Sequence, residues 1–272
     1  MGVSRYKSDT NHLTIFSYNT KVKTYANGDK SIEFHSYINN KGFPKVKDKC
    51  SKLKYDKDEI EKSREHQKFK NLYRTKQAII DLAYHNGIMI PWEYFVTLTF
   101  DDKKVNANNY DTLSPALTKW LNNMKHQNPN MRYILAPEPH PKSGRIHFHG
   151  IFANVPNWKL TEARNPHTGR LIKRNGLQIY NLANYKYGYT TVSKVTNLEA
   201  VSVYISKYIT KELINLCYKK RYWCSQGLER PTIEYADFDE ETLMFSIDKD
   251  KIKNKYEKTT EFSKSIYLQI RS

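Results

Sequence analysis

Strand-forming runs, most of them with alternating apolar and polar residues, recur along much of the chain. β-rich runs at 13–18 and 32–37 are joined through Asn27-Gly28, the strongest short-range signal for a hairpin. Further strands are expected at 92–100, 131–136, 145–153 and 188–195. In the first of these, the side chains divide between two faces: Val96, Leu98 and Phe100 against Phe95, Thr97 and Thr99.

Helical patterns separate these strands. Apolar residues recur every three or four positions in the second half of 56–86, and Gly87 is expected to end that helix. Ser114-Pro115 is typical of an N-cap followed by proline at the first helical position, so a second helix is expected from there to Lys125. A third helix is expected at 197–220, with a buried stripe made of Leu198, Val201, Ile205, Ile209, Leu213 and Leu216.

The chain is strongly basic, with a net charge of +17 over 272 residues and a pI near 9.5. Such a surface attracts polyanions, of which nucleic acid is the default candidate. Aromatic residues make up 13% of the chain, including 21 tyrosines, and single-stranded bases stack on exposed rings. The basic segments 41–54 and 156–178 are candidates for contacts with duplex or hairpin DNA; the alternative is ordinary solvated surface.

Other features disfavour several classes of protein. Three cysteines without a Cys-x-x-Cys pair argue against a disulfide scaffold and a zinc ribbon. No apolar run approaches the roughly 20 residues of a membrane helix, and no secretory signal is present. A cytoplasmic protein is therefore expected. Since no Gly-x-x-x-x-Gly-Lys-Ser/Thr motif occurs, no ATP site of the P-loop type is expected.

A pair of histidines lies in the expected strand 145–153. His147 and His149 are two residues apart, so their imidazoles share one face and can reach a single divalent cation. Glu138, before the turn on the neighbouring strand, can supply a carboxylate, and His140 in the turn is an alternative third ligand. Such a set accepts Mn²⁺ or Mg²⁺ and leaves positions for water and a phosphate oxygen. The alternative is a half-exposed strand with ordinary polar residues outward.

A pair of tyrosines lies in the expected helix 197–220. Tyr204 and Tyr208 are four residues apart and so adjacent at the edge of the buried stripe, with Lys207 and Lys211 beside them. A phenol has a pKa near 10 and is a weak nucleophile until a neighbouring cation stabilises its phenolate. The alternative is that both rings simply flank an amphipathic helix.

The two constellations together suit the nicking of DNA through a phosphotyrosyl intermediate. A divalent metal polarises the scissile phosphate, a tyrosine attacks it, and the 3′-hydroxyl leaves as a primer.

At these positions the sequence resembles the HUH endonucleases, and among them the rolling-circle replication initiators of plasmids and small phages. Phe95–Phe100 resembles the first motif of the family, Gly144–Gly150 the metal motif, and Tyr204–Lys211 the tyrosine motif. The metal motif precedes the tyrosine, which is the order of replication initiators, whereas conjugative relaxases have the reverse order. The resemblance covers about 92–220, nearly half of the chain.

The resemblance implies an α+β fold of the HUH/RRM-like Rep nuclease type. Its centre would be an antiparallel β-sheet with helices packed on one face, and with N- and C-terminal extensions. The expected segments are 1–88 with the hairpin, basic loop and first helix, 89–220 as the endonuclease core, and 221–272 as the C-terminal extension.

The resemblance also assigns roles to particular residues. Glu138 matches the acidic third metal ligand of related initiators, beside His147 and His149. Tyr208 best matches the single catalytic tyrosine, and Tyr204 matches the second tyrosine of the two-tyrosine subgroup, in which one residue opens the cycle and the other closes it. The remaining expected site residues are Lys207 and Lys211 beside the tyrosines, and Arg145 and Lys142 on the DNA.

The expected function is therefore a metal-dependent replication initiator. It would nick and rejoin single-stranded origin DNA, held in a hairpin, through a 5′-phosphotyrosine to start and end rolling-circle replication. A host helicase and DNA polymerase would be its partners, because no motor motif is present. Two alternatives are a two-tyrosine transposase acting on element ends, and a non-catalytic origin-binding regulator that kept the fold.

Overall fold

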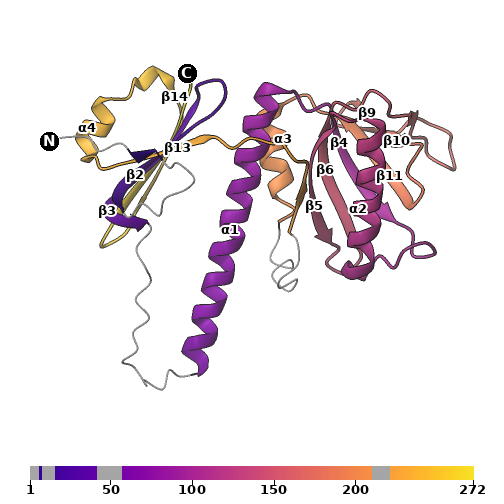
Figure 1. Ribbon diagram of the computed structural model, residues 1–272, viewed down its shortest axis with the longest axis horizontal. Helices are drawn as coiled ribbons and strands as arrows, with labels where there is room; N and C mark the ends of the chain where they lie inside the picture. The colour runs from indigo at the N-terminus through magenta and orange to yellow at the C-terminus, as the bar shows by residue number, and fades with distance from the viewer. Residues whose placement is uncertain (1–5, 8–15, 42–56, 210–220) are drawn as a thin grey trace. The chain divides into compact units, whose positions relative to one another are not determined.

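A computed structural model describes residues 6–7, 16–41, 57–209 and 221–272 (Figure 1). The chain forms two compact units, Met1–Lys54 with Arg230–Ser272, and Tyr55–Glu229. The N-terminal hairpin and most of the C-terminal extension therefore share the first unit, whereas the long helix of the expected segment 1–88 belongs to the second. Both units are built on antiparallel sheets, which confirms the α+β class.

The first unit contains a six-stranded antiparallel sheet in the order β1-β13-β2-β3-β15-β14. Its strands are β1 (Tyr6–Lys7), β2 (Phe16–Thr24), β3 (Lys30–Lys41), β13 (Thr232–Ala236), β14 (Ile252–Thr259) and β15 (Lys264–Ile270). A short helix α4 (Glu240–Phe245) and a 3₁₀ turn (Lys249–Lys251) connect β13 to β14. Leu243 of α4 packs on Ile32 and Phe34, which closes a small core over one face.

The predicted N-terminal hairpin is confirmed as β2 and β3. Its turn needs a glycine, because Gly28 has a φ of 86° while its N–H donates to the Tyr25 carbonyl at 2.9 Å. Residues 13–15 of the predicted first strand, and most of the basic loop 41–54, lie outside the described residues.

The second unit contains a seven-stranded antiparallel sheet in the order β12-β5-β6-β4-β11-β10-β7. Its strands are β4 (Tyr94–Phe100), β5 (Arg132–Pro139), β6 (Ile146–Ala153), β7 (Leu160–Glu162), β10 (Tyr180–Leu182), β11 (Gly188–Lys194) and β12 (Trp223–Cys224). The four strands expected between 92 and 195 are thus confirmed as β4, β5, β6 and β11. A separate two-stranded hairpin, β8 (Lys173–Arg174) and β9 (Leu177–Gln178), arises within the basic stretch 156–178.

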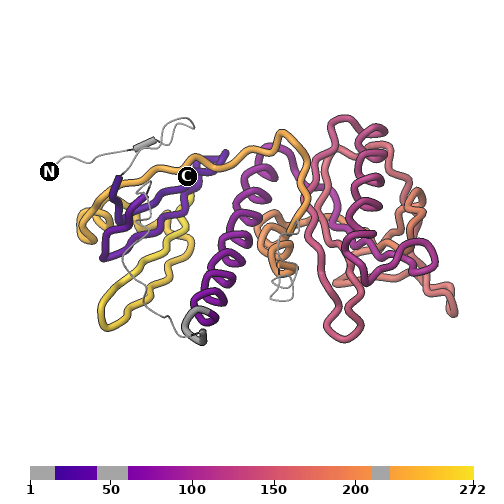
Figure 2. The backbone as a smooth tube through the Cα atoms, turned by 60° about the horizontal axis from the view of Figure 1, so that its bottom comes forward, coloured from indigo at the N-terminus to yellow at the C-terminus, as the bar shows by residue number. Residues whose placement is uncertain are grey.

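Helices cover both faces of this sheet, so the expectation of helices on one face is wrong. Helix α2 (Tyr110–Gln127) packs on one face, where its Leu117 joins Leu98 and Phe148 in one core. Helices α1 (Lys57–Met89) and α3 (Leu198–Ser206) lie side by side on the other face, as Figures 1 and 2 show. The reason is that β6 carries apolar residues on both sides, so each side needs a cover.

Each helix differs at one end from the sequence expectation. Helix α1 continues through Gly87, which is needed for close packing: a Cβ there would lie 2.2 Å from Leu198 Cδ1. Helix α2 begins at Tyr110, one turn before Ser114, because the Asn109 side chain accepts from the Asp111 N–H. No helix in the described residues is both long and apolar enough to span a membrane.

Candidate functional site

The candidate site lies on the face of the second sheet that α1 and α3 cover. Strand register sets it up: His147 is paired with Glu138 of β5 and Thr99 of β4, and His149 is paired with Ala136 and Thr97. Because directly paired residues of antiparallel strands point to the same side, one face carries both imidazoles, the carboxylate and two threonine hydroxyls.

His149 is held at both ring nitrogens. Its Nδ1 lies 3.1 Å from Thr97 Oγ1, and its Nε2 lies 2.7 Å from Glu138 Oε2. The imidazole is buried, with 8% of the residue exposed. His147 repeats half of this arrangement, since its Nδ1 lies 3.0 Å from Thr99 Oγ1.

The two threonines are functional candidates that sequence reasoning missed. Alternation already placed Thr97 and Thr99 on one face of β4, but it did not show that each hydroxyl meets a histidine Nδ1. A partner on Nδ1 fixes the orientation of the ring and directs Nε2 toward a ligand. A hydroxyl can donate or accept, so it tolerates either tautomer.

Burial shifts the pKa values of the titratable groups in the site and so favours their neutral forms. It lowers the pKa of His149 to about 3, helped by the neighbouring charges of His147 and Arg174. Burial also lowers the pKa of His147 and raises that of the Glu138 carboxyl. Although Glu138 and His149 are close enough for an ion pair, these directions favour a hydrogen bond that involves a neutral imidazole.

The donor set suits a divalent metal in its chemistry. Neutral imidazoles with their Nδ1 atoms engaged, beside a carboxylate, are what a metal of this class needs. Within the described part of the chain, however, no three His, Cys, Asp or Glu side chains are gathered closely enough to hold a metal ion. Glu138 and His149 instead contact each other directly.

The two tyrosines are brought to this site from different backbone environments. Tyr204 lies in α3, whereas Tyr208 lies in the turn after it, because the helix ends at Ser206. The expected helix to residue 220 is thus wrong at 207–209, and 210–220 lie outside the described residues. Tyr208 is 8% exposed and stacks on His149, with ring centroids 3.6 Å apart and planes 8° from parallel. Tyr204 is 42% exposed and meets Tyr208 edge-on at 5.5 Å.

The surroundings of Tyr208 oppose its ionisation. Burial raises the pKa of its phenol most, followed by a hydrogen bond with the Tyr204 side chain and by the charge of Glu138. The positive charge of Arg174 acts in the opposite direction. Tyr208 in this state is therefore a protonated phenol, and a cation or phosphate must change its environment before it can attack.

The other expected site residues are more scattered. Lys207 Nζ lies 5.2 Å from the centre of the Tyr204 ring, and Lys211 lies outside the described residues. Arg145 forms an ion pair with Asp102, and its guanidinium also donates to the Phe100 carbonyl at 2.7 Å. Its charge is therefore already engaged by protein.

The expected residues of the β5–β6 turn lie at the surface. Lys142 is exposed there. His140 is also exposed, and its Nδ1 accepts from the Ser143 N–H at 3.3 Å.

Arg174 is a second residue that sequence reasoning missed. It lies in the hairpin β8–β9, whose turn residues Asn175 and Gly176 have φ values of 50° and 78°. It lines a cavity together with Thr97 and Tyr204, which places it near the candidate site, and its charge acts on both His149 and Tyr208. The sequence offered only a basic stretch at 156–178, with no signal for which cation would turn toward the histidines.

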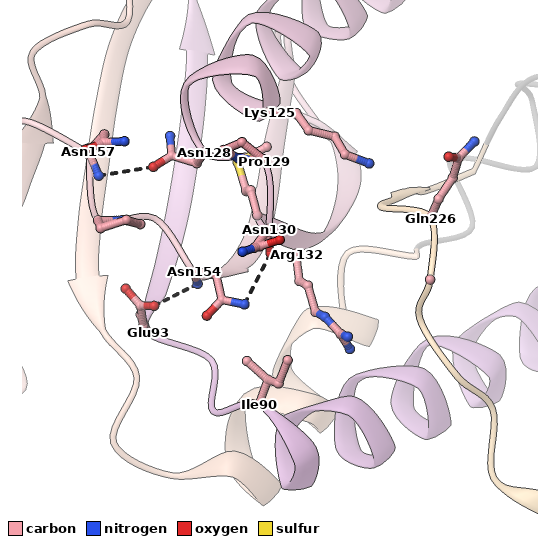
Figure 3. Close-up of a pocket in the computed structure, with 13 residues that line it drawn as sticks. Ile90, Glu93, Lys125, Asn128, Pro129, Asn130, Arg132, Asn154, Asn157 and Gln226 are labelled. Carbon is pink, nitrogen blue, oxygen red and sulfur yellow. Dashed lines mark hydrogen bonds between the residues drawn. The ribbon is translucent and has the colours of Figure 1, made fainter.

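A cavity of about 750 Å³ lies at the opposite end of β5 and β6, near Arg132 and Asn154 (Figure 3). None of the expected site residues lines it. Its asparagines are largely bonded to the protein, as when the Asn154 N–H donates to Glu93 Oε1 at 2.7 Å. It is separate from the candidate site.

Part of the chain is similar to a known protein family. Residues 93–213 match the sequence model of the family described as replication-associated protein ORF2/G2P. No curated protein matches the chain significantly, and neither does any solved structure. The matched segment lies within the second unit and contains both histidines and both tyrosines. It is consistent with a replication initiator that interacts with DNA.

Proposed function

We propose that this chain is a replication initiator that nicks single-stranded origin DNA with a tyrosine and later rejoins it. The observation that carries the proposal is the stacking of Tyr208 on His149 at 3.6 Å, within the segment that matches a replication-associated family. A nucleophile candidate thus lies against a histidine that is itself bonded to a carboxylate. This combination suits phosphodiester chemistry better than a role in packing alone.

A divalent cation, Mn²⁺ or Mg²⁺, would be held by Glu138, His147 and His149, and it would supply Lewis-acid polarisation of the scissile phosphate. Thr97 and Thr99 keep the two Nδ1 atoms engaged, so the Nε2 atoms are the ones that would bind the cation. For His149 the cation would replace the direct contact of Nε2 with Glu138.

Tyr208 is the proposed first nucleophile. Its phenolic oxygen forms the new bond to phosphorus while the bond from phosphorus to the 3′-oxygen breaks. The phenol loses its proton to solvent, and the leaving 3′-oxygen takes one up from solvent. The more exposed Tyr204 would serve in the second, joining reaction. Positive charge from Arg174 favours the phenolate, which the burial of Tyr208 disfavours.

One alternative has a specific observation in its favour. The raised pKa and low exposure of Tyr208, with no three metal-ligating side chains gathered among the described residues, also suit a non-catalytic protein that binds origin DNA. A regulator of this kind would bind DNA but form no covalent adduct.

The deciding experiment incubates the full chain with Mn²⁺ and end-labelled single-stranded DNA that carries the origin hairpin of its replicon. A covalent protein–DNA adduct is expected, resistant to denaturant and absent in EDTA. Tyr208→Phe should reduce the first cleavage at least about 1000-fold, as expected for loss of a nucleophile. Tyr256→Phe is the matched control, because Tyr256 is 62% exposed and lies on β14 of the first unit, outside the site. No adduct with wild type, or an equal yield from a Tyr204→Phe/Tyr208→Phe double variant, would contradict the mechanism.

A further inference from the structure

A second cavity, of about 260 Å³, opens beside the candidate site. It lies between β4, β11, the hairpin β8–β9 and the start of α3. It adjoins the site through two shared residues: Thr97 lines it and bonds to His149, and Tyr204 lines it and contacts Tyr208. Its volume is slightly below the range of about 300–1000 Å³ for small-molecule pockets, which suits one ring with its attached group.

The charged side chains that line this cavity are all positive. Arg174 and Lys194 both line it, both are exposed, and no described residue in its lining is acidic. Within the described residues, neither side chain has a protein partner in a hydrogen bond or ion pair. This contrasts with Arg145, whose charge Asp102 engages. Two available cations in one cavity lining are suited to an anionic ligand such as a phosphodiester.

The lining also contains aromatic and apolar side chains, among neutral polar ones. Phe95 and Tyr204 meet edge-on, with ring centroids 5.3 Å apart, and both line the cavity together with Leu177 and Ile179 of the hairpin region. Rings and aliphatic side chains in the same lining as a pair of cations suit a nucleotide, because its base needs a stacking surface and its phosphate needs a positive charge.

We propose that this cavity binds one nucleotide of single-stranded DNA next to the scissile phosphate, with Arg174 and Lys194 on its backbone phosphate and Phe95 and Tyr204 against its base. The assignment rests on the proposed function for the identity of the strand. Arg174, in place of Arg145, then makes the contact with the DNA backbone that was expected from the sequence. The assignment also gives Tyr204 a role in binding besides its proposed role in the joining reaction.

The test measures binding without cleavage, by fluorescence anisotropy of a labelled origin oligonucleotide with the full chain in EDTA. Arg174→Ala should weaken binding about tenfold and reduce the slope of log K against log salt by about 0.7, the value for one phosphate contact on a single strand. Ala200→Trp, which fills the cavity from the first turn of α3, should weaken binding about tenfold and leave the slope unchanged. Arg170→Ala is the matched control, because Arg170 is exposed in the same basic stretch and does not line the cavity.

An abasic scan of the oligonucleotide locates the occupant. One abasic position beside the nick should weaken binding to wild type about tenfold and should have little further effect on Ala200→Trp, because both changes remove the same contact. Thymidine 5′-monophosphate should compete only weakly with the oligonucleotide. If it competes as well as the strand does, the occupant is a free nucleotide and the assignment to DNA is overturned.

The outcomes separate this proposal from the proposed function. If Arg174→Ala and Ala200→Trp both bind like wild type while keeping its circular dichroism, the nucleotide site is wrong, even if adduct formation proceeds. If both weaken binding as expected but wild type forms no adduct with Mn²⁺, the nucleotide site holds and the nicking mechanism is wrong.

Discussion

The two faces of the seven-stranded sheet are made by the same strands and yet differ in kind. Toward α2, neighbouring side chains such as Leu98 and Phe148 are fully buried and apolar. Toward α3, the intervening residues are polar. Thr97 bonds to His149, Thr99 bonds to His147, and His149 also contacts Glu138. The alternation of β-strands thus makes one face apolar around Leu98 and Phe148, while the other face combines an apolar core around Ile151 with the polar cluster at His147 and His149.

The difference between the two faces is tested most directly by truncating adjacent residues that point to opposite faces. Phe148→Ala should cost about 3–5 kcal/mol of unfolding free energy, because it leaves a cavity in a core that α2 closes. His149→Ala should cost less stability and should abolish adduct formation, because it removes a proposed metal ligand and the ring under Tyr208. Urea unfolding and the adduct assay measure the two effects. Equal stability losses with adduct formation retained would mean that His149 is a core residue like its neighbour.

The pH dependence of stability should also come from the α3 face. The pKa of His149 is about 3 in the folded chain, against about 6.5 when unfolded. Its neutral form therefore contributes stability that is fully present above about pH 6.5 and is lost as the pH falls toward 3, by at most roughly 5 kcal/mol.

The measurement is the difference between wild type and His149→Gln in urea unfolding at several pH values, with EDTA present. This difference is needed because the raised pKa of Glu138 acts in the opposite sense. His126→Gln, at an exposed position of α2, is the control for a histidine substitution outside the site. Parallel curves for wild type and His149→Gln would contradict the assignment of a buried neutral imidazole.

The threonines of β4 provide a finer test. Thr97→Val and Thr99→Val keep the size of the side chain and remove the hydroxyl that bonds each histidine Nδ1. Each should weaken Mn²⁺ binding about 10–100-fold, measured by calorimetry, with little change in stability. Thr191→Val is the control, because Thr191 is paired with Thr97 on the same face but has no histidine partner among the described contacts. If the control weakens Mn²⁺ binding as much, the effect is not due to orientation of the histidines.

How far the sequence could predict this structure depends on the range of each interaction. The hairpin around Gly28 and the faces of β4 and β6 follow from local periodicity, and all were predicted. The pairing of β13 with β2 joins residues about 200 positions apart and leaves no local signal. For the same reason, the sequence could not show that strands near the N-terminus pair with strands near the C-terminus.

The candidate site shows the same division. Spacing alone grouped His147 with His149, and register then brought Glu138 beside them. The stacking of Tyr208 on His149 depends on where α3 ends, and the approach of Arg174 depends on a two-residue turn far along the chain. Helix ends and turn directions are set by packing and capping, so periodicity cannot supply them.

The smallest expected effect concerns the start of helix α2, which covers the apolar face of the sheet. Asn109→Ala should cost about 1 kcal/mol of unfolding free energy, because the Asn109 side chain accepts the Asp111 N–H at 2.9 Å. Ser114→Ala, at the position that sequence favoured as the cap, should change stability by less than about 0.5 kcal/mol, since Ser114 lies inside the helix. Neither variant should alter adduct formation, because this face holds none of the proposed chemistry. A larger loss from Ser114→Ala would place the start of α2 at Ser114, and a loss of adduct from either variant would mean that the two faces do not act independently.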